Sequence, residues 1–214
     1  MKKAWMAWAL AAALVCGGTA MAEQPGLSGT LEGAQAVEWA ENQVQVKYPV
    51  LTEGSALQRA RVNSAIETEV VRFQKDIEKQ NETGSVQGWV NWLGAYRDNN
   101  WVSVVLLEST YYKGAAHPTT KVVGMSFDKY GYRITRPQAL MMIPNRTPEE
   151  IQSEVEKQAA ARGIQLFPEK YRTLTSWPQE WFLGTDGHVH FIFQQYEIAP
   201  YAAGWIAVDA GINK

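Results

Sequence analysis

Three consecutive stretches with the pattern of β-strands constrain the fold more than any other feature of the sequence. They span residues 86–96, 101–112 and 119–128, and a polar Asn99-Asn100 pair supplies the turn before the second. The run from Trp101 to Leu107 is apolar on both faces, which is typical of a strand covered on both sides. The sequence therefore predicts a sheet in which residues 101–112 form a central strand.

Two amphipathic helices are expected to cover such a sheet. The longer one begins at Ser55, which forms a capping-box pattern with Gln58, and ends near Gly84. The shorter one extends from Thr147 to Gly163 and also begins with a capping box. The apolar stripe predicted for the long helix consists of Leu57, Val62, Ile66, Val70, Phe73 and Ile77.

The remaining segments add strands at both ends of the chain. Residues 36–48 read as one strand because Val44, Val46 and Tyr48 alternate with polar residues. A short helix is predicted over 136–142, and further strands over 181–183, 188–195 and 205–208. The predicted class is α+β, a mixed and mostly antiparallel sheet with one long and one shorter packed helix, with the option of two sub-lobes.

The N-terminus has the three parts of a secretory signal peptide. Lys2 and Lys3 precede an apolar run over residues 4–15, and Ala20-Met21-Ala22 is an A-x-A cleavage site. The run is shorter than the ~20 residues that a membrane span needs. We therefore expect cleavage near Ala22, a periplasmic or secreted product, a flexible segment over 23–34, and one domain over 35–214 with no transmembrane span.

Composition excludes several classes of protein. The chain has 20 basic and 22 acidic residues, and loss of the signal leaves 18 basic residues, so no excess of positive charge is available for nucleic acid. Its only cysteine is Cys16, inside the signal, so the mature chain lacks disulfides and thiolate ligands. A lipid anchor on Cys16 is disfavoured, because Ala13 and Val15 stand where a lipobox has leucine and a small residue.

The histidines are the first place to look for chemistry. His188 and His190 lie two apart on a predicted strand, so they project from one face and are a possible beginning of a metal site. The sequence indicates no third ligand, and a partly covered sheet face is the simpler interpretation. No G-x-S-x-G or S-x-x-K motif is present. We therefore predict no catalytic residue, no metal and no cofactor.

Two loop segments combine tyrosines with small residues and one proline. The first, Gly114-Ala115-Ala116-His117-Pro118, follows two tyrosines; the second spans residues 196–204 and reads YEIAPYAAG. Tyrosines offer an apolar body with a polar tip, which suits a contact surface. If the strands that precede the two loops run side by side in the same direction, both loops emerge at one edge and form a common surface. Structural turns are the alternative. The candidate binding residues are Tyr111, Tyr112, Gly114, His117, Pro118, Tyr196, Glu197, Pro200 and Tyr201.

These segments resemble a bacterial cell-envelope domain of unknown function. It forms the lysozyme-binding ectodomain of RsiV-like anti-sigma factors and the N-terminal region of PdaC-type peptidoglycan deacetylases. The resemblance rests on Tyr48-Pro49, the long helix, the GAAHP segment, and a final motif from Phe193 through YEIAPYAAG. Ala115 replaces the second glycine of the family pattern, and the turn over residues 128–132 has tyrosine where the family often has threonine. The resemblance implies two α+β parts sharing a mixed sheet.

Two functions follow as hypotheses. The first is a non-catalytic periplasmic binding module whose partner is a lysozyme-like protein or a peptidoglycan fragment, as the resemblance implies. The second is a hydrolase, or an enzyme associated with deacetylation, that acts on peptidoglycan or oligosaccharide through His117 or the pair His188 and His190. Without a catalytic constellation in the sequence, the first hypothesis is preferred.

Overall fold

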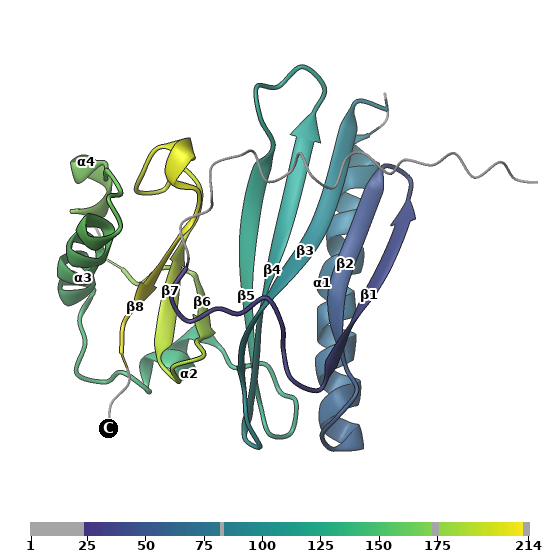
Figure 1. Cartoon of the computed structure of the whole chain (residues 1–214), viewed down its shortest axis with the longest axis horizontal. Coiled ribbons are helices and arrows are strands. Elements are labelled where there is room, and N and C mark those ends of the chain that lie inside the picture. The colour runs from purple at the N-terminus through teal and green to yellow at the C-terminus, as the bar shows by residue number, and fades with distance from the viewer. Residues whose placement is uncertain (1–23, 82–83, 173–175, 212–214) are drawn as a thin grey trace, which may run out of the picture.

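The computed structural model describes residues 24–81, 84–172 and 176–211 (Figure 1). The predicted signal peptide, its cleavage site and Cys16 lie outside the described residues. None of the helices in the described ranges is both long enough and apolar enough to span a bilayer.

The first of two sheets has five strands and one long helix. The strands are β1 (Ala34–Glu41), β2 (Val44–Leu51), β3 (Val86–Arg97), β4 (Trp101–Tyr112) and β5 (Thr119–Asp128), arranged in that order. Helix α1 (Ala56–Gln80) connects β2 to β3, the parallel pair, and the other pairs are antiparallel. The three predicted strands are confirmed. Strand β4 is flanked on both sides and lies one position in from the edge.

The prediction of a single strand over residues 36–48 is wrong. The segment is a hairpin of β1 and β2, and its turn consists of Asn42 and Gln43. Both have positive φ, 46° and 69°. A tight hairpin turn with this twist needs positive φ at both central residues. Glycine usually marks such a turn, and glutamine at the second position hides it from sequence reasoning.

Helix α1 lies across one face of this sheet. Its start is capped as predicted, since Ser55 Oγ accepts a hydrogen bond from Gln58 N at 3.1 Å. The predicted apolar stripe is buried except for Leu57, which is 51 % exposed, while Gln58 is buried in its place. The turn after β5 packs here, because Gln58 Nε2 donates to Asp128 O at 3.5 Å.

A buried carboxylate helps fix the helix against the sheet. Glu108 on β4 is 3 % exposed, and Arg72 of α1 donates to both of its oxygens at 2.8 and 2.9 Å. Burial raises the pKa of Glu108 to about 7, although the nearby guanidinium acts in the opposite direction. Arg72 also pairs with Glu69 and Asp76 on its own helix. The arginine therefore links one face of the helix to a single position on β4.

The second sheet has three antiparallel strands and a helix on its outer face. The strands are β6 (Glu180–Leu183), β7 (Val189–Phe193) and β8 (Ile206–Asp209), in that order. Helix α3 (Pro148–Ala161) covers it and has the predicted capping box at Thr147. The connections contain α2 (Arg136–Leu140), α4 (Pro168–Tyr171) and the 3₁₀ turn η1 (Tyr201–Ala203). The α+β class with mostly antiparallel pairing is confirmed.

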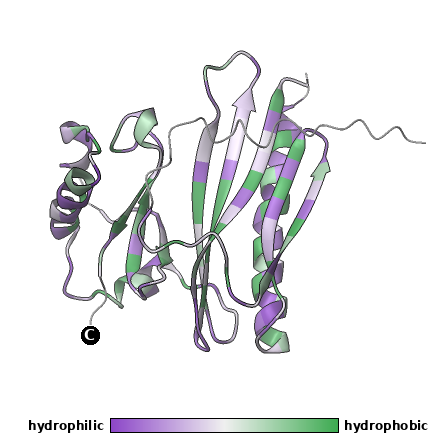
Figure 2. Cartoon of the chain, viewed as in Figure 1, coloured by the Kyte–Doolittle hydropathy of each residue, from purple (hydrophilic) through white to green (hydrophobic). Residues whose placement is uncertain are grey.

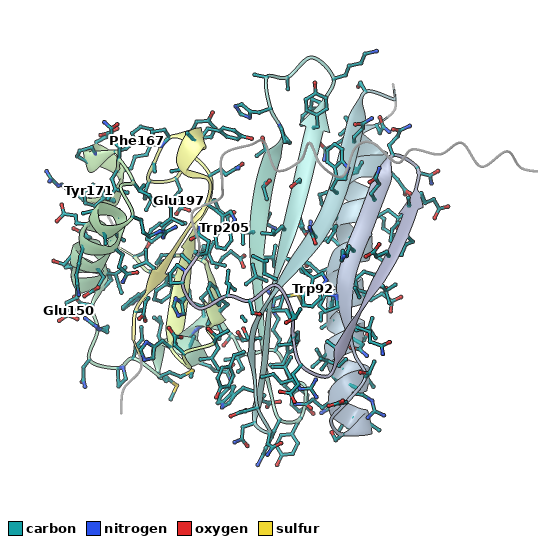
Figure 3. The ribbon with its side chains drawn as sticks, viewed as in Figure 1. Trp92, Glu150, Phe167, Tyr171, Glu197 and Trp205 are labelled. Atoms are coloured by element: carbon teal, nitrogen blue, oxygen red, sulfur yellow. The ribbon has the colours of Figure 1, made fainter. Side chains whose placement is uncertain are left out.

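The elements form four layers, which are α1, the five-stranded sheet, the three-stranded sheet and α3 (Figure 1). Apolar and polar residues alternate along β2 of the larger sheet, as Figure 2 shows. Trp205 is 1 % exposed and packs between the two sheets (Figure 3). The residues that the sheets bury against each other are Ala95, Val105, Val122, Phe182, Ile192, Trp205 and Ala207.

Small residues allow the two sheets to approach closely. A Cβ added to Gly124 of β5 would lie 1.8 Å from the carbonyl oxygen of Trp181 in β6. Beside it, the hydroxyls of Ser103 and Ser126 accept hydrogen bonds from Leu183 N at 3.1 and 3.2 Å. No side chain larger than hydrogen fits at position 124 without separating the sheets. The close contact thus depends on glycine at position 124, which leaves room for the carbonyl of Trp181, and on the two serine hydroxyls, which bond the Leu183 N–H.

Strand β5 is an edge strand, and side chains cover its free hydrogen-bonding groups. Gln194 accepts from Val122 N and donates to Val122 O, both at 2.8 Å, so its amide takes the place of a neighbouring strand. Gln195 accepts from Thr120 N at 2.8 Å, and Glu180 accepts from Gly124 N at 3.1 Å. An uncovered edge would expose a row of unpaired groups. Here the second half of the chain provides the partners.

The same arrangement is repeated along β8. Gln24 donates to Trp205 O at 2.7 Å and accepts from Ala207 N at 2.9 Å. Gln158 of α3 bonds both the N–H and the carbonyl of Asp209 at 3.0 Å. Within the segment that the sequence predicts to be flexible, Gln24 is buried and Ser28 pairs with Gly94 of β3.

Replacement of Phe73 tests the packing of α1. Phe73 is 5 % exposed and lies against Gly88 of β3, so Phe73→Ala should lower the free energy of unfolding by ~3–5 kcal/mol. Chemical denaturation monitored by circular dichroism measures this change. Leu57→Ala on the exposed side of the same helix is the control and should change stability by about 0.5 kcal/mol or less. A similar loss in both variants would contradict the assignment of the buried face.

Candidate functional site

The two loops predicted from the sequence meet at one end of the molecule. The β4–β5 loop and the loop that carries η1 project at the same end (Figure 1). The ring of His117 stacks on that of Tyr201, with centroids 3.6 Å apart and planes at 19°. Its Nε2 lies 3.2 Å from the hydroxyl of Tyr196. We call His117, Pro118, Tyr196 and Tyr201 the aromatic cluster.

Hydrogen bonds join the two loops within this cluster. The hydroxyl of Tyr201 donates to Pro118 O at 3.1 Å. Burial raises the pKa of Tyr201. His117 Nδ1 lies 3.2 Å from the same carbonyl oxygen. Pro118 thus receives contacts from both aromatic rings, and the loops are held together without any main-chain pairing between them.

Tyr196 has a backbone conformation that is unusual for its residue type. Its φ is 64°, in the left-handed region that bulky residues rarely adopt, and its side chain is 46 % exposed. Lys170 Nζ donates to its carbonyl at 2.7 Å, and the edge-covering Gln194 and Gln195 directly precede it. Strained residues that the surroundings hold in place are concentrated at functional sites. The conformation keeps the phenol ring at the surface beside His117.

Other residues of the second loop help to shape it. The carboxylate of Glu197 accepts from Gln194 N at 2.6 Å and closes the turn after β7 (Figure 3). Pro200 precedes η1, and the buried Ile198 and Ala199 anchor the loop from below. Glu197 and Pro200 were predicted as binding residues. The structure places them where they shape the loop that presents Tyr196 and Tyr201.

The tyrosines at the end of β4 divide between the two faces of the sheet. Tyr112 is 48 % exposed, and its hydroxyl bonds Gln80 near the end of α1. Strand alternation places the half-buried Tyr111 on the opposite face. Gly114 has φ 92° and supplies the turn toward His117. Tyr112 therefore lies on the α1 side of the sheet, away from the second loop, although the sequence groups it with His117.

The two loops meet, but not because their strands are neighbours in one sheet. The sequence hypothesis required their two strands to run side by side in one sheet. Strands β4 and β7 belong to different sheets, and the loops come together because Gln194 and Gln195 attach the end of β7 to the edge of β5. No sequence motif marks these glutamines, since their partners are main-chain groups more than 70 residues away.

A separate concave feature lies beside α3. It is a cavity of about 440 Å³ lined by Gln24, Pro25, Gly26, Leu27, Gln158, Ala161, Arg162 and Thr185. Arg162 donates to the side-chain oxygen of Gln24 and to Ala207 O, and burial lowers the pKa of its guanidinium. The cavity shares no residue with the aromatic cluster.

Comparisons with known proteins agree with this architecture. Residues 141–209 match the profile of a family described as protein of unknown function, DUF3298. This match includes α3, all three strands of the smaller sheet and the loop that carries Tyr196 and Tyr201. A search of curated proteins finds no match.

Two solved structures have the same fold over most of the chain. One is a DUF3298 family protein from Pseudomonas aeruginosa, with a TM-score of 0.54, 13% identity, and coverage of 89% of this chain and 92% of that one. The other is a member of the same family from Bacteroides fragilis, with a TM-score of 0.50 and 12% identity. That match covers 87% of this chain and 90% of the other one. At these identities the likeness concerns the fold alone. The resemblance to RsiV-like and PdaC-type proteins stays a hypothesis.

A double-mutant cycle measures how strongly the two loops are coupled. The stacked pair His117 and Tyr201 should contribute an interaction energy of ~0.5–1.5 kcal/mol to the free energy of unfolding. The cycle compares His117→Ala, Tyr201→Ala and the double variant by chemical denaturation. Additive losses from the two single variants would mean that the loops are not coupled through these rings.

Proposed function

We propose that the chain is a non-catalytic binding module that acts in the cell envelope and uses the aromatic cluster to contact a protein. The observation that carries this proposal is the joining of two loops, far apart in sequence, into one surface that presents the strained and half-exposed Tyr196. Tyrosine gives a large contact area at low entropic cost. Backbone strain that is held at an exposed aromatic residue is hard to explain by packing alone.

The shape of the surface favours a protein over a glycan as the partner. The β4–β5 loop projects beyond the end of β3 as a hairpin, as Figure 1 shows. Small-molecule and sugar sites are usually concave, whereas a projecting hairpin fits into the cleft of another protein. The resemblance of the GAAHP and YEIAPYAAG segments makes a secreted lysozyme the first partner to test. The signal-like N-terminus supports a periplasmic or secreted location for such an encounter.

The alternative of a peptidoglycan hydrolase has less support at this site. Among the described residues, the ring of His117 contacts Pro118, Tyr196 and Tyr201, none of which has a carboxylate. In the Ser-His-Asp arrangement, a carboxylate on the second nitrogen orients the histidine that acts as the general base. Here that nitrogen lies near the carbonyl of the next residue. His188 and His190 do have carboxylate partners, which are Asp209 and Asp186.

Binding to lysozyme should depend on the aromatic cluster. In titrations followed by calorimetry, Tyr196→Ala and His117→Ala should each weaken binding about tenfold or more, because truncating a central aromatic contact typically costs more than 1 kcal/mol. Tyr132→Ala is the matched control. It removes a tyrosine that is 56 % exposed at the opposite end of β5, so affinity should not change.

Two results would contradict the proposal. One is equal affinity of the wild type and both cluster variants, with melting temperatures lowered instead, which would make the loops purely structural. The other is binding of muropeptides or chitooligosaccharides at this surface without binding of lysozyme, which would replace the protein partner with a glycan. Release of soluble sugar from peptidoglycan by pure protein would support the hydrolase instead.

A further inference from the structure

Four side chains with metal-binding atoms converge at the end of the smaller sheet. Asp186 and His188 lie in the turn between β6 and β7, His190 lies on β7, and Asp209 ends β8. His190 Nε2 is 3.0 and 3.1 Å from the two oxygens of Asp186. His188 Nδ1 is 3.2 and 3.0 Å from those of Asp209, and 3.8 Å from the nearer oxygen of Asp186.

Strand register explains why these side chains meet. His190 and Asp209 are direct partners across the β7–β8 pair, so their side chains lie on one face of the sheet. His188 precedes His190 by two residues and projects from the same face. The turn brings Asp186 back over that face. One donor atom from each of Asp186, His190 and Asp209 lies within 4.8 Å of the others.

The position of His190 is fixed before any ion binds. The residue is 0 % exposed, and its ring stacks on Phe182 with centroids 5.0 Å apart and planes at 10°. A Cβ at Gly26 would lie 2.6 Å from its Nε2, and one at Gly184 would lie 2.5 Å from it. Two glycines from separate segments therefore leave open the space around the nitrogen that faces Asp186.

The carboxylates are also oriented from outside the cluster. Asp209 Oδ1 accepts from Gly211 N at 2.6 Å, while Gln158 holds the main chain of Asp209 on both sides. Asp186 Oδ1 accepts from His188 N at 3.0 Å. Outer hydrogen bonds of this kind orient the ligands in known metal sites. The carboxyl groups of Asp186 and Asp209 remain partly open to solvent, which gives an ion access.

We propose that Asp186, His188, His190 and Asp209 bind one Zn²⁺ ion. With bonds of ~2.0–2.1 Å, neighbouring ligand atoms in a tetrahedral site lie about 3.3 Å apart. The pairs in direct contact here lie 3.0 to 3.8 Å apart, and donor atoms of Asp186, His190 and Asp209 lie within 4.8 Å of one another. The side chains would therefore move closer together around the ion, with His188 joining through its contact with Asp209. Two imidazoles and two carboxylates balance the charge of a divalent ion. This mixed nitrogen and oxygen set favours Zn²⁺ over the oxygen-seeking Mg²⁺ and Ca²⁺.

The ion would fasten the β6–β7 turn to the end of β8. These two segments are otherwise joined across the cluster by the hydrogen bond between His188 and Asp209. Because the ligands are gathered only in the folded chain, bound Zn²⁺ would raise thermal stability by mass action. This site is independent of the aromatic cluster, which lies beyond the other end of β7.

The direct test is calorimetric titration of untagged full-length protein, freed of metal by chelation, with ZnCl₂. We expect one ion per chain and a higher melting temperature, with no response to MgCl₂. His188→Gln, at a partly exposed position, and Asp209→Asn should each weaken binding at least about tenfold. His117→Ala is the matched control, since it removes the third histidine of the mature chain and should leave the affinity unchanged.

A second readout reports the geometry of the site. Co²⁺ in a tetrahedral site absorbs visible light far more strongly than six-coordinate Co²⁺, so the strong spectrum should form with wild type and disappear in His188→Gln. Circular dichroism checks that the variant is folded; if Asp209→Asn fails to fold, His188→Gln alone decides. Absence of one-to-one Zn²⁺ binding at millimolar concentration, or equal affinity in wild type and His188→Gln, would overturn the proposal.

Discussion

The pairing of glutamine side chains with strand edges is the interaction on which the rest of the structure depends. The amide of Gln194 bonds both main-chain groups of Val122 in β5. The amides of Gln24 and Gln158 likewise bond main-chain N–H and carbonyl groups along β8. A primary amide has the donor and acceptor of a peptide group, so it can end a sheet without adding a strand. The edge thus avoids both unpaired groups and further strand pairing.

The hydrogen bonds that cover the edge of β5 also determine where the aromatic cluster lies. Gln194 and Gln195 are followed at once by Tyr196, so fixing the two amides on β5 brings that tyrosine to the β4–β5 loop. The close contact at Gly124 sets the distance between the sheets on which both glutamines rely. The surface is therefore a consequence of how the sheets are joined, and it needs no main-chain pairing between the two loops.

Sequence reasoning succeeded where the signal is local. Residues that are neighbours in the chain determine the periodicity of α1, the N-cap at Ser55, the capping box at Thr147 and the strands over 86–128. The hairpin at Asn42 and Gln43 was missed because neither residue is glycine. The segment after Glu23 was read as flexible from its composition, while its burial depends on Gln24 reaching β8.

Long-range contacts limit what the sequence can reveal about the sites. His117 and the two tyrosines were predicted from their loop composition, and their meeting was expected for a reason that proved only partly right. Tyr112 was grouped with them because the alternation of side chains between the two faces of β4 was not applied to its last residues. His188 and His190 were recognised as a pair. Asp209 could be added only once the register of β7 and β8 was known, and Asp186 only once the path of the β6–β7 turn was known.

Amide hydrogen exchange at Val122 tests the central claim most directly. In the wild type, the Val122 amide should exchange slowly, like interior strand amides such as that of Val104, because its partner is the Gln194 side chain. In Gln194→Ala its protection should fall at least about tenfold, the equivalent of one lost hydrogen bond, while Val104 stays protected. Fast exchange at Val122 in the wild type, or unchanged protection in the variant, would contradict the account.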